Sequence, residues 1–174
     1  MELRPYTVFI SHASEDLALA TWVAGLLDED LVQYFLDHRH LAAGDDFRET
    51  IRSRMQLSNE FLWLLTPDAM RSPWLAVELG MALAFKVRIV PMLHRISVEQ
   101  FNAYARWQGL VTNLTMASIE RFDAYRKELM DRVLLYNDDS SLRADSVLAP
   151  RSQVSEVEIA RAVVALRQAR RRNA

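Results

Sequence analysis

The chain has 174 residues, 51% of them hydrophobic, which is enough for one globular domain with a sizeable core and an appended element. It contains no cysteine, which excludes a disulfide scaffold, a zinc–thiolate site and a cysteine nucleophile. The formal net charge of -2 is uneven, because residues 151–174 hold six Arg and two Glu, so the acidic remainder is a poor platform for nucleic acid.

Four apolar segments predict β-strands. In chain order they cover residues 7–11, 32–37, 61–65 and 87–93. Helical patterns separate them, and the strands are apolar on both faces, which is typical of a parallel sheet covered on both sides. Residues 109–112 are a candidate edge strand, so we expect a doubly wound α/β fold with about five strands.

Helices are expected between the strands. The first covers residues 15–29, with Ser14 as its N-cap and acidic residues in its first turn, where they favour the helix dipole. Its buried face is expected to contain Leu19, Trp22, Val23, Leu26 and Leu27. A polar loop over 38–46 leads to a second helix over 47–57.

The part of the chain after the fourth strand is expected to be mainly helical. Ser97 and Gln100 form a capping box that opens a short helix to Trp107. A longer helix over 118–136 follows. Its inward side chains are expected to be Ile119, Phe122, Leu129, Val133 and Leu134.

Three units are expected along the chain. Residues 1–136 form the domain, and residues 137–152, with Asp, Ser and Pro, are typical of a linker. Residues 153–174 form a basic amphipathic C-terminal helix. This extra helix either packs back on the domain or mediates self-association, and the pattern leaves both alternatives open.

A helix expected to begin at Pro73, directly after Ser72, carries the single charge of Glu78 in an otherwise apolar run. Trp74 and Glu78 are four residues apart and therefore share a face. Removing a carboxylate from water costs several kcal/mol, so Glu78 needs either an ion-pair partner or a catalytic or ligand-binding role. The candidate partners are Arg48 and Arg52.

Ligands of open α/β sheets bind beyond the carboxyl ends of the strands, near the point where the strand order reverses. Three segments meet that description: residues 11–14 after the first strand, residues 37–47 after the second, and the start of the Glu78 helix after the third. The backbone amides of residues 13–16 are placed to face a phosphate, although Glu15 and Asp16 weaken an anion site.

Several protein classes lack their signals. The four glycines form neither a GxGxxG fingerprint nor a phosphate loop, which argues against a Rossmann dehydrogenase or an NTPase. There is no GxSxG elbow, and His38 and His40 in a loop are a weak signal, so no metal site is predicted. The short polar start and the lack of a run of about 20 apolar residues predict neither export nor membrane insertion, so we expect a cytoplasmic protein.

Over about residues 6–136 the chain resembles a TIR (Toll/interleukin-1 receptor) domain, of the bacterial stand-alone type. Four boxes in the order of the family carry the resemblance: Thr7 to Asp16; Leu36-Asp37 with Leu41-x-x-Gly44 and Phe47-x-x-x-Ile51; Phe61 to Thr66 with Ser72-x-Trp74-x-x-x-Glu78-Leu79; and Ile89-Val90-Pro91. The resemblance implies a flavodoxin-like sheet.

TIR domains are of two functional kinds: scaffolds that signal by self-association, and enzymes that break the nicotinamide–ribose bond of NAD. The enzymatic kind carries its key glutamate where Glu78 stands. The resemblance therefore implies an NAD-cleaving enzyme that needs no cofactor and yields nicotinamide with ADP-ribose or a cyclic ADP-ribose isomer, in bacterial antiviral defence signalling. The implied partners are NAD, further copies of the chain and an effector that senses the product.

The resemblance also implies roles for individual residues. Glu78 would hold a ribose hydroxyl and stabilise the cationic ribose, or bond to it transiently, and Trp74 would shape the wall of the site. The remaining substrate-binding candidates are Ser11, His12, Ala13, Ser14, Asp37 and Phe47. Core packing is the alternative for Trp74 and Phe47, and a purely structural role is the favoured reading for His12 and Asp37.

Because the chain departs from the family pattern at two places, the resemblance leaves open how the substrate is bound and which product is formed. Some TIR hydrolases have a glutamate where this chain has Ala42, and the aromatic residue that some enzymes place after the first strand is missing at Ala13 and Ser14. The main rival function is a non-catalytic TIR scaffold or a mimic of host signalling, which predicts an ion-paired Glu78. A nucleoside glycosyl-transferring enzyme is a third reading.

Overall fold

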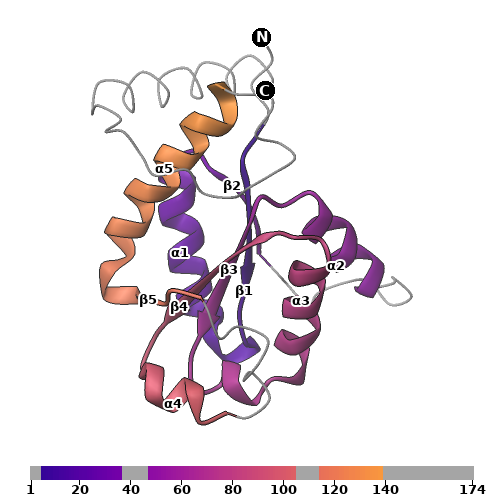
Figure 1. Cartoon of the computed structure of the whole chain (residues 1–174), viewed down its shortest axis with the longest axis vertical. Coiled ribbons are helices and arrows are strands. Elements are labelled where there is room, and N and C mark those ends of the chain that lie inside the picture. Colours follow the sequence, from indigo (N-terminus) through magenta and orange to yellow (C-terminus); the bar gives the residue numbers. More distant parts are fainter. Residues whose placement is uncertain (1–4, 37–46, 105–113, 139–174) are drawn as a thin grey trace.

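The computed structural model describes residues 5–36, 47–104 and 114–138 and holds a five-stranded parallel sheet in the order β2-β1-β3-β4-β5 (Figure 1). The strands are β1 (Thr7–Ser11), β2 (Gln33–Leu36), β3 (Glu60–Leu65), β4 (Arg88–Leu93) and β5 (Ala117–Ser118). The α-helices are α1 (Leu17–Glu29), α2 (Phe47–Gln56), α3 (Pro73–Ala84), α4 (Val98–Asn102) and α5 (Phe122–Asp138). Short 3-10 turns cover Ser14–Asp16, Ala69–Arg71 and Ile119–Arg121. This is the predicted doubly wound α/β fold.

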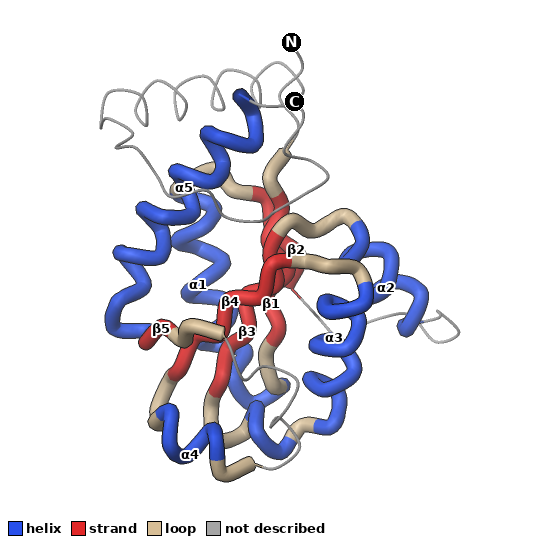
Figure 2. The backbone as a smooth tube through the Cα atoms, viewed as in Figure 1, coloured by secondary structure: helices blue, strands red, loops and turns tan. Residues whose placement is uncertain are grey.

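Helices cover both faces of the sheet, as Figure 2 shows. Successive side chains of a strand point to opposite faces, so Val8 and Ile10 pack with α1 and α5, whereas Phe9 packs with α2 and α3. All six residues of β3 are buried, because this strand lies in the middle of the sheet. The central strands thus have the two-sided burial that their apolar sequences predict.

The predicted strands and helices largely agree with the structure, and most of the differences lie at their ends. Residues 7–11 form a strand as predicted, and the capping box of Ser97 and Gln100 is present at the start of α4. That helix ends at Asn102, before the predicted Trp107. The observed fifth strand is Ala117–Ser118, whereas the predicted edge strand at 109–112 lies outside the described residues.

The start of the first helix differs from the prediction. Ser14 is not its N-cap but the first residue of a 3-10 turn, and α1 proper begins at Leu17. Trp22, predicted to be buried, is 49% exposed and packs its ring on Phe122 of α5, with 5.6 Å between ring centroids. The small residues Ala20 and Ala24 take buried positions in the core on this side of the sheet instead.

A buried charged cluster joins the amino ends of the strands to α5. Glu60 is the first residue of β3 and has no exposed surface, and Arg132 of α5 donates hydrogen bonds from Nε and Nη2 to its carboxylate. The hydroxyls of Tyr6 and Tyr125 also donate to Glu60, at 2.7 and 3.1 Å. No pattern in the sequence predicts this cluster, although Glu60 directly precedes the predicted apolar strand 61–65.

No helix in the described residues is long and apolar enough to span a membrane. Helix α5 continues to Asp138, past the predicted end of the first unit at residue 136, and the division of the chain into three units stays a prediction. The rest of the linker and the predicted helix over 153–174 lie outside the described residues.

Candidate active site

The strand order reverses between β1 and β3, so the loops that follow these two strands flank the point where ligands of such sheets bind. The chain turns from β1 outward to β2, and from β3 outward through β4 to β5. Ser11, the last residue of β1, pairs in register with Trp63 of β3. Ser11 shares a face with Phe9, which is the face covered by α3, so the pleat directs its hydroxyl toward that helix.

Helix α3 brings Glu78 to this hydroxyl. Pro73 occupies the first helical position, and Ser72 before it has the extended backbone of an N-cap, although its side chain makes no capping hydrogen bond. Leu75 and Leu79 anchor the helix on the sheet, and Glu78, between them, is fully buried. The helix start and the inward direction of Glu78 agree with the sequence analysis.

Among the described residues, Ser11 and Trp74 donate hydrogen bonds to the Glu78 carboxylate. The Ser11 hydroxyl donates to Oε2 at 2.5 Å, and the Trp74 indole Nε1–H donates to Oε1 at 3.1 Å. Trp74 lies one turn before Glu78, as the spacing predicts. A carboxylate that receives a donor on each oxygen is fixed in orientation.

One predicted partner of Glu78 is occupied elsewhere. Arg52 forms its ion pair with Glu49, at 3.2 Å on the same helix, and its guanidinium lies over the Phe85 ring at 5.9 Å from the centroid. Arg48, the other predicted partner, is exposed. In the described part of the chain, the donors to Glu78 therefore include two neutral side chains, Ser11 and Trp74. The hydrogen bond from Ser11 was not predicted from the sequence.

The residues of the turn after β1 differ in their exposure to solvent. His12 and Ala13 are 5% and 1% exposed, and Ala13 belongs to the core on the α3 side, whereas Ser14 is exposed. The Asp16 backbone N–H donates to the Ala13 carbonyl at 3.0 Å, so that amide serves the turn and not a phosphate. Of the predicted residues in this turn, Ser14 is the one that reaches solvent.

The turn after β1 is tied to the loop after β3. The Thr66 hydroxyl donates to Asp16 Oδ2 at 2.5 Å and accepts the Ala69 backbone N–H at 3.0 Å. Burial raises the pKa of the Asp16 carboxyl above its ordinary value, and the hydrogen bond from Thr66 opposes that shift. The two loops are therefore held together on either side of the point where the strand order reverses.

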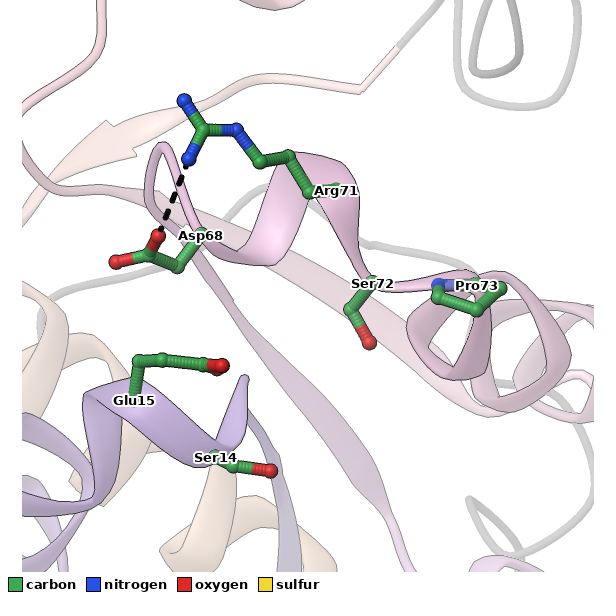
Figure 3. A pocket seen from close by; sticks show the side chains of 6 residues that line it. All are labelled: Ser14, Glu15, Asp68, Arg71, Ser72 and Pro73. Atoms are coloured by element: carbon green, nitrogen blue, oxygen red, sulfur yellow. Dashed lines mark ion pairs between the residues drawn. The ribbon is translucent and has the colours of Figure 1, made fainter.

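A pocket of about 340 Å³ lies between these two loops (Figure 3). Residues from the first loop and from the β3–α3 connection line it: Ser14, Glu15, Asp68, Arg71, Ser72 and Pro73. Ser14 comes three residues after Ser11, and Pro73 directly precedes Trp74, so the lining adjoins both donors to Glu78. Glu78 itself is fully buried and is not part of that lining.

The structure leaves part of the predicted site undescribed. Asp37 and the loop over 38–46 lie outside the described residues. Phe47 is the first residue of α2, and its backbone alone is described. The structure therefore joins Ser11, Trp74 and Glu78 but does not test the predicted loop over the site. Within the described ranges no three His, Asp or Glu residues gather as metal ligands.

Sequence reasoning missed the pocket residues Asp68 and Arg71. Their position could have been inferred from the topology, because both lie in the connection that leaves the sheet beside β1. Their side-chain directions depend on the 3-10 turn Ala69–Arg71, which has no clear sequence signature.

A family comparison and one solved TIR domain agree with this architecture. The family described as TIR domain matches residues 8–130. The TIR domain of the Toll-related receptor TRR-2 from Hydra magnipapillata has a TM-score of 0.58 at 19% sequence identity, covering 72% of this chain and 96% of its own. The TIR domains of the activated Roq1 resistosome, which directly recognises the pathogen effector XopQ, give 0.49 at 18% identity, covering 76% and 80%. No curated protein matches the chain.

Proposed function

The chain belongs to the TIR domain family, and on that premise we propose that it is an enzyme that breaks the nicotinamide–ribose bond of NAD. The observation that carries the proposal is the buried Glu78 carboxylate, which Ser11 and Trp74 orient, in a fold that also has a pocket at the carboxyl ends of β1 and β3. A buried carboxylate costs free energy, and a family of NAD-cleaving enzymes carries its key glutamate at this position, so the cost has a functional reason.

The proposed chemistry needs one carboxylate. The nicotinamide of NAD is a cationic pyridinium, so the electron pair of the C–N bond leaves with its ring nitrogen and no acid is required. The ribose is left with oxocarbenium character, and the negative charge of Glu78 stabilises it. Water then adds to the ribose carbon and loses a proton to give ADP-ribose, or an adenine nitrogen adds to give a cyclic isomer.

Ser11 and Trp74 have a distinct part in this proposal. Each donates to one oxygen of Glu78, so the carboxylate does not rotate when charge develops at the ribose. The apolar wall that includes Leu75 and Leu79 keeps water away from the charge and strengthens its field. Ser14, the exposed residue of the β1 turn, is placed to contact the substrate.

The test is nicotinamide release from NAD by the purified full chain at high concentration, since self-association is part of the proposal. Glu78→Gln keeps the size of the side chain and removes its charge, and Glu128→Gln on the exposed side of α5 is the control. The proposal expects release by the wild type and the control and loss with Glu78→Gln. Chromatography of the second product distinguishes ADP-ribose from a cyclic isomer.

A second candidate is a non-catalytic TIR scaffold that acts by self-association. The observation in its favour is that Glu78 has 0% exposed surface and is not part of the pocket lining, so substrate reaches it only after the wall moves. Under this reading no nicotinamide is released at any protein concentration. The cytoplasmic location, the role in antiviral defence and a product-sensing effector are part of the proposal for the enzyme.

A further inference from the structure

Arg71 carries the positive charge in the lining of the pocket between the β1 turn and the β3–α3 connection. We propose that Arg71 binds the diphosphate of the substrate and thereby selects a dinucleotide over a nucleoside. This inference rests on the proposed function for its substrate, but the contact it describes can be measured without catalysis.

The backbone that carries Arg71 is firmly held. Ala69 and Met70, the two preceding residues, are fully buried in the core on the α3 side. The Ala69 N–H donates to the Thr66 hydroxyl at 3.0 Å, and the Arg71 N–H donates to the Asp68 carbonyl at 3.0 Å. The root of the side chain is thus in place before a ligand arrives, which lowers the entropic cost of binding.

The guanidinium of Arg71, in contrast, is loosely paired. Its Nη1 lies 3.7 Å from Asp68 Oδ1, and the two side chains are 75% and 45% exposed (Figure 3). An exposed pair of this kind contributes little to stability because water screens it. The contact to Asp68 is a single long one, whereas a diphosphate carries two negative charges and can bind both arms of the planar arginine fork, so we expect a phosphate to displace Asp68.

The two carboxylates of the pocket lining oppose the binding of a diphosphate, so a positive charge is needed to offset them. Glu15 and Asp68 are the carboxylates of the lining, and together they repel a doubly negative diphosphate. They suit the cationic nicotinamide end of the same molecule. The amino end of α3 at Pro73 adds a favourable dipole for an anion, but Arg71 supplies the full positive charge among the lining residues.

Calorimetric titration of the full chain with ADP-ribose, and with adenosine as the phosphate-free probe, tests the contact. Arg71→Gln is expected to weaken ADP-ribose binding about tenfold or more and to leave adenosine binding within about twofold of the wild type. Asp68→Asn removes the competing carboxylate and is expected to tighten ADP-ribose binding. Arg52→Gln breaks an exposed pair of the same i,i+3 spacing on α2 and is the matched control.

Three results would overturn the inference. They are unchanged ADP-ribose binding in Arg71→Gln, an equal loss for both probes in that variant, and no ADP-ribose binding by the wild type at millimolar concentration. A purely structural role for the pair predicts that Asp68→Asn and Arg71→Gln change binding in the same direction. A third combination is also informative. If Arg71→Gln weakens and Asp68→Asn tightens ADP-ribose binding but no nicotinamide is released from NAD, the diphosphate contact stands and the proposed reaction fails.

Discussion

Ser11 and Glu78 lie 67 positions apart in the sequence, and the hydroxyl of the first donates a 2.5 Å hydrogen bond to the carboxylate of the second. The contact joins the end of β1 to the second turn of α3. Both residues are fully buried, so neither group has water as a substitute partner. This bond therefore links the stability of the domain to the geometry of the candidate active site.

Ser11→Ala is expected to lower both stability and activity. The variant leaves one oxygen of a buried carboxylate without this donor, which costs about 1–3 kcal/mol in the free energy of unfolding. Nicotinamide release per folded molecule should fall as well, because Glu78 is no longer fixed on both oxygens. Urea unfolding and the release assay measure the two effects. Ser53→Ala on the exposed side of α2 is the control, and equal behaviour of the two variants would contradict the prediction.

Trp74→Phe separates the indole N–H from the aromatic ring. The ring still covers the wall of the site, but the donor to Glu78 Oε1 at 3.1 Å is lost. A hydrogen bond to a charged group contributes about 1.5–3 kcal/mol, so kcat for nicotinamide release should fall about tenfold or more. We expect a smaller change in KM, because the partner of the indole is Glu78 and not the substrate. An unchanged kcat would assign Trp74 to core packing alone.

The fold and the position of Glu78 were predictable because both follow from periodicity. Continuous apolar strands that alternate with helices specify a parallel sheet, and four-residue spacing puts Trp74 and Glu78 on one face. The hydrogen bond between these two residues is a local consequence of that spacing.

Long-range pairings were less predictable, because no local pattern encodes them. Ser11 meets Glu78 only through the strand order and the pleat of β1. Trp22 is half exposed because its ring packs on Phe122 of α5, a contact between distant parts of the chain. The same holds for Glu60, whose partner Arg132 lies 72 positions later. Local sequence propensities do not indicate which of the many arginines of the chain pairs with Glu60.

Glu60→Gln is expected to destabilise the domain strongly without a direct effect on the active site. Burial alone lowers the pKa of Arg132, but the charge of Glu60 and its hydrogen bond raise it above the ordinary value, so Arg132 stays cationic. Removing the partner of a buried cation costs about 3–5 kcal/mol in the free energy of unfolding. Glu128→Gln removes the exposed partner of the same arginine and should cost less than about 1 kcal/mol. Similar urea midpoints for the two variants would refute this distinction.

Asp16→Asn is expected to stabilise the domain at neutral pH, and the gain should vanish in acid. Burial raises the pKa of Asp16 in the folded chain, so the folded state binds its proton more tightly than the unfolded state does. The ionised carboxylate therefore reduces stability at pH values above the raised pKa. Below the ordinary value of 3.8 both states carry the proton, and the wild type should resemble the variant.

The asparagine oxygen can still accept the hydrogen bond that the Thr66 hydroxyl gives to Asp16, so the variant changes the charge and little else. Urea unfolding of both proteins at pH 7 and at pH 3.5 measures the difference in the free energy of unfolding. Asp123→Asn, at a side chain 90% exposed on α5, shows the general effect of removing one carboxylate. A loss of stability at pH 7 that grows as the pH rises would mean that the charge of Asp16 holds the two loops together, which would reverse the sign argued from its burial.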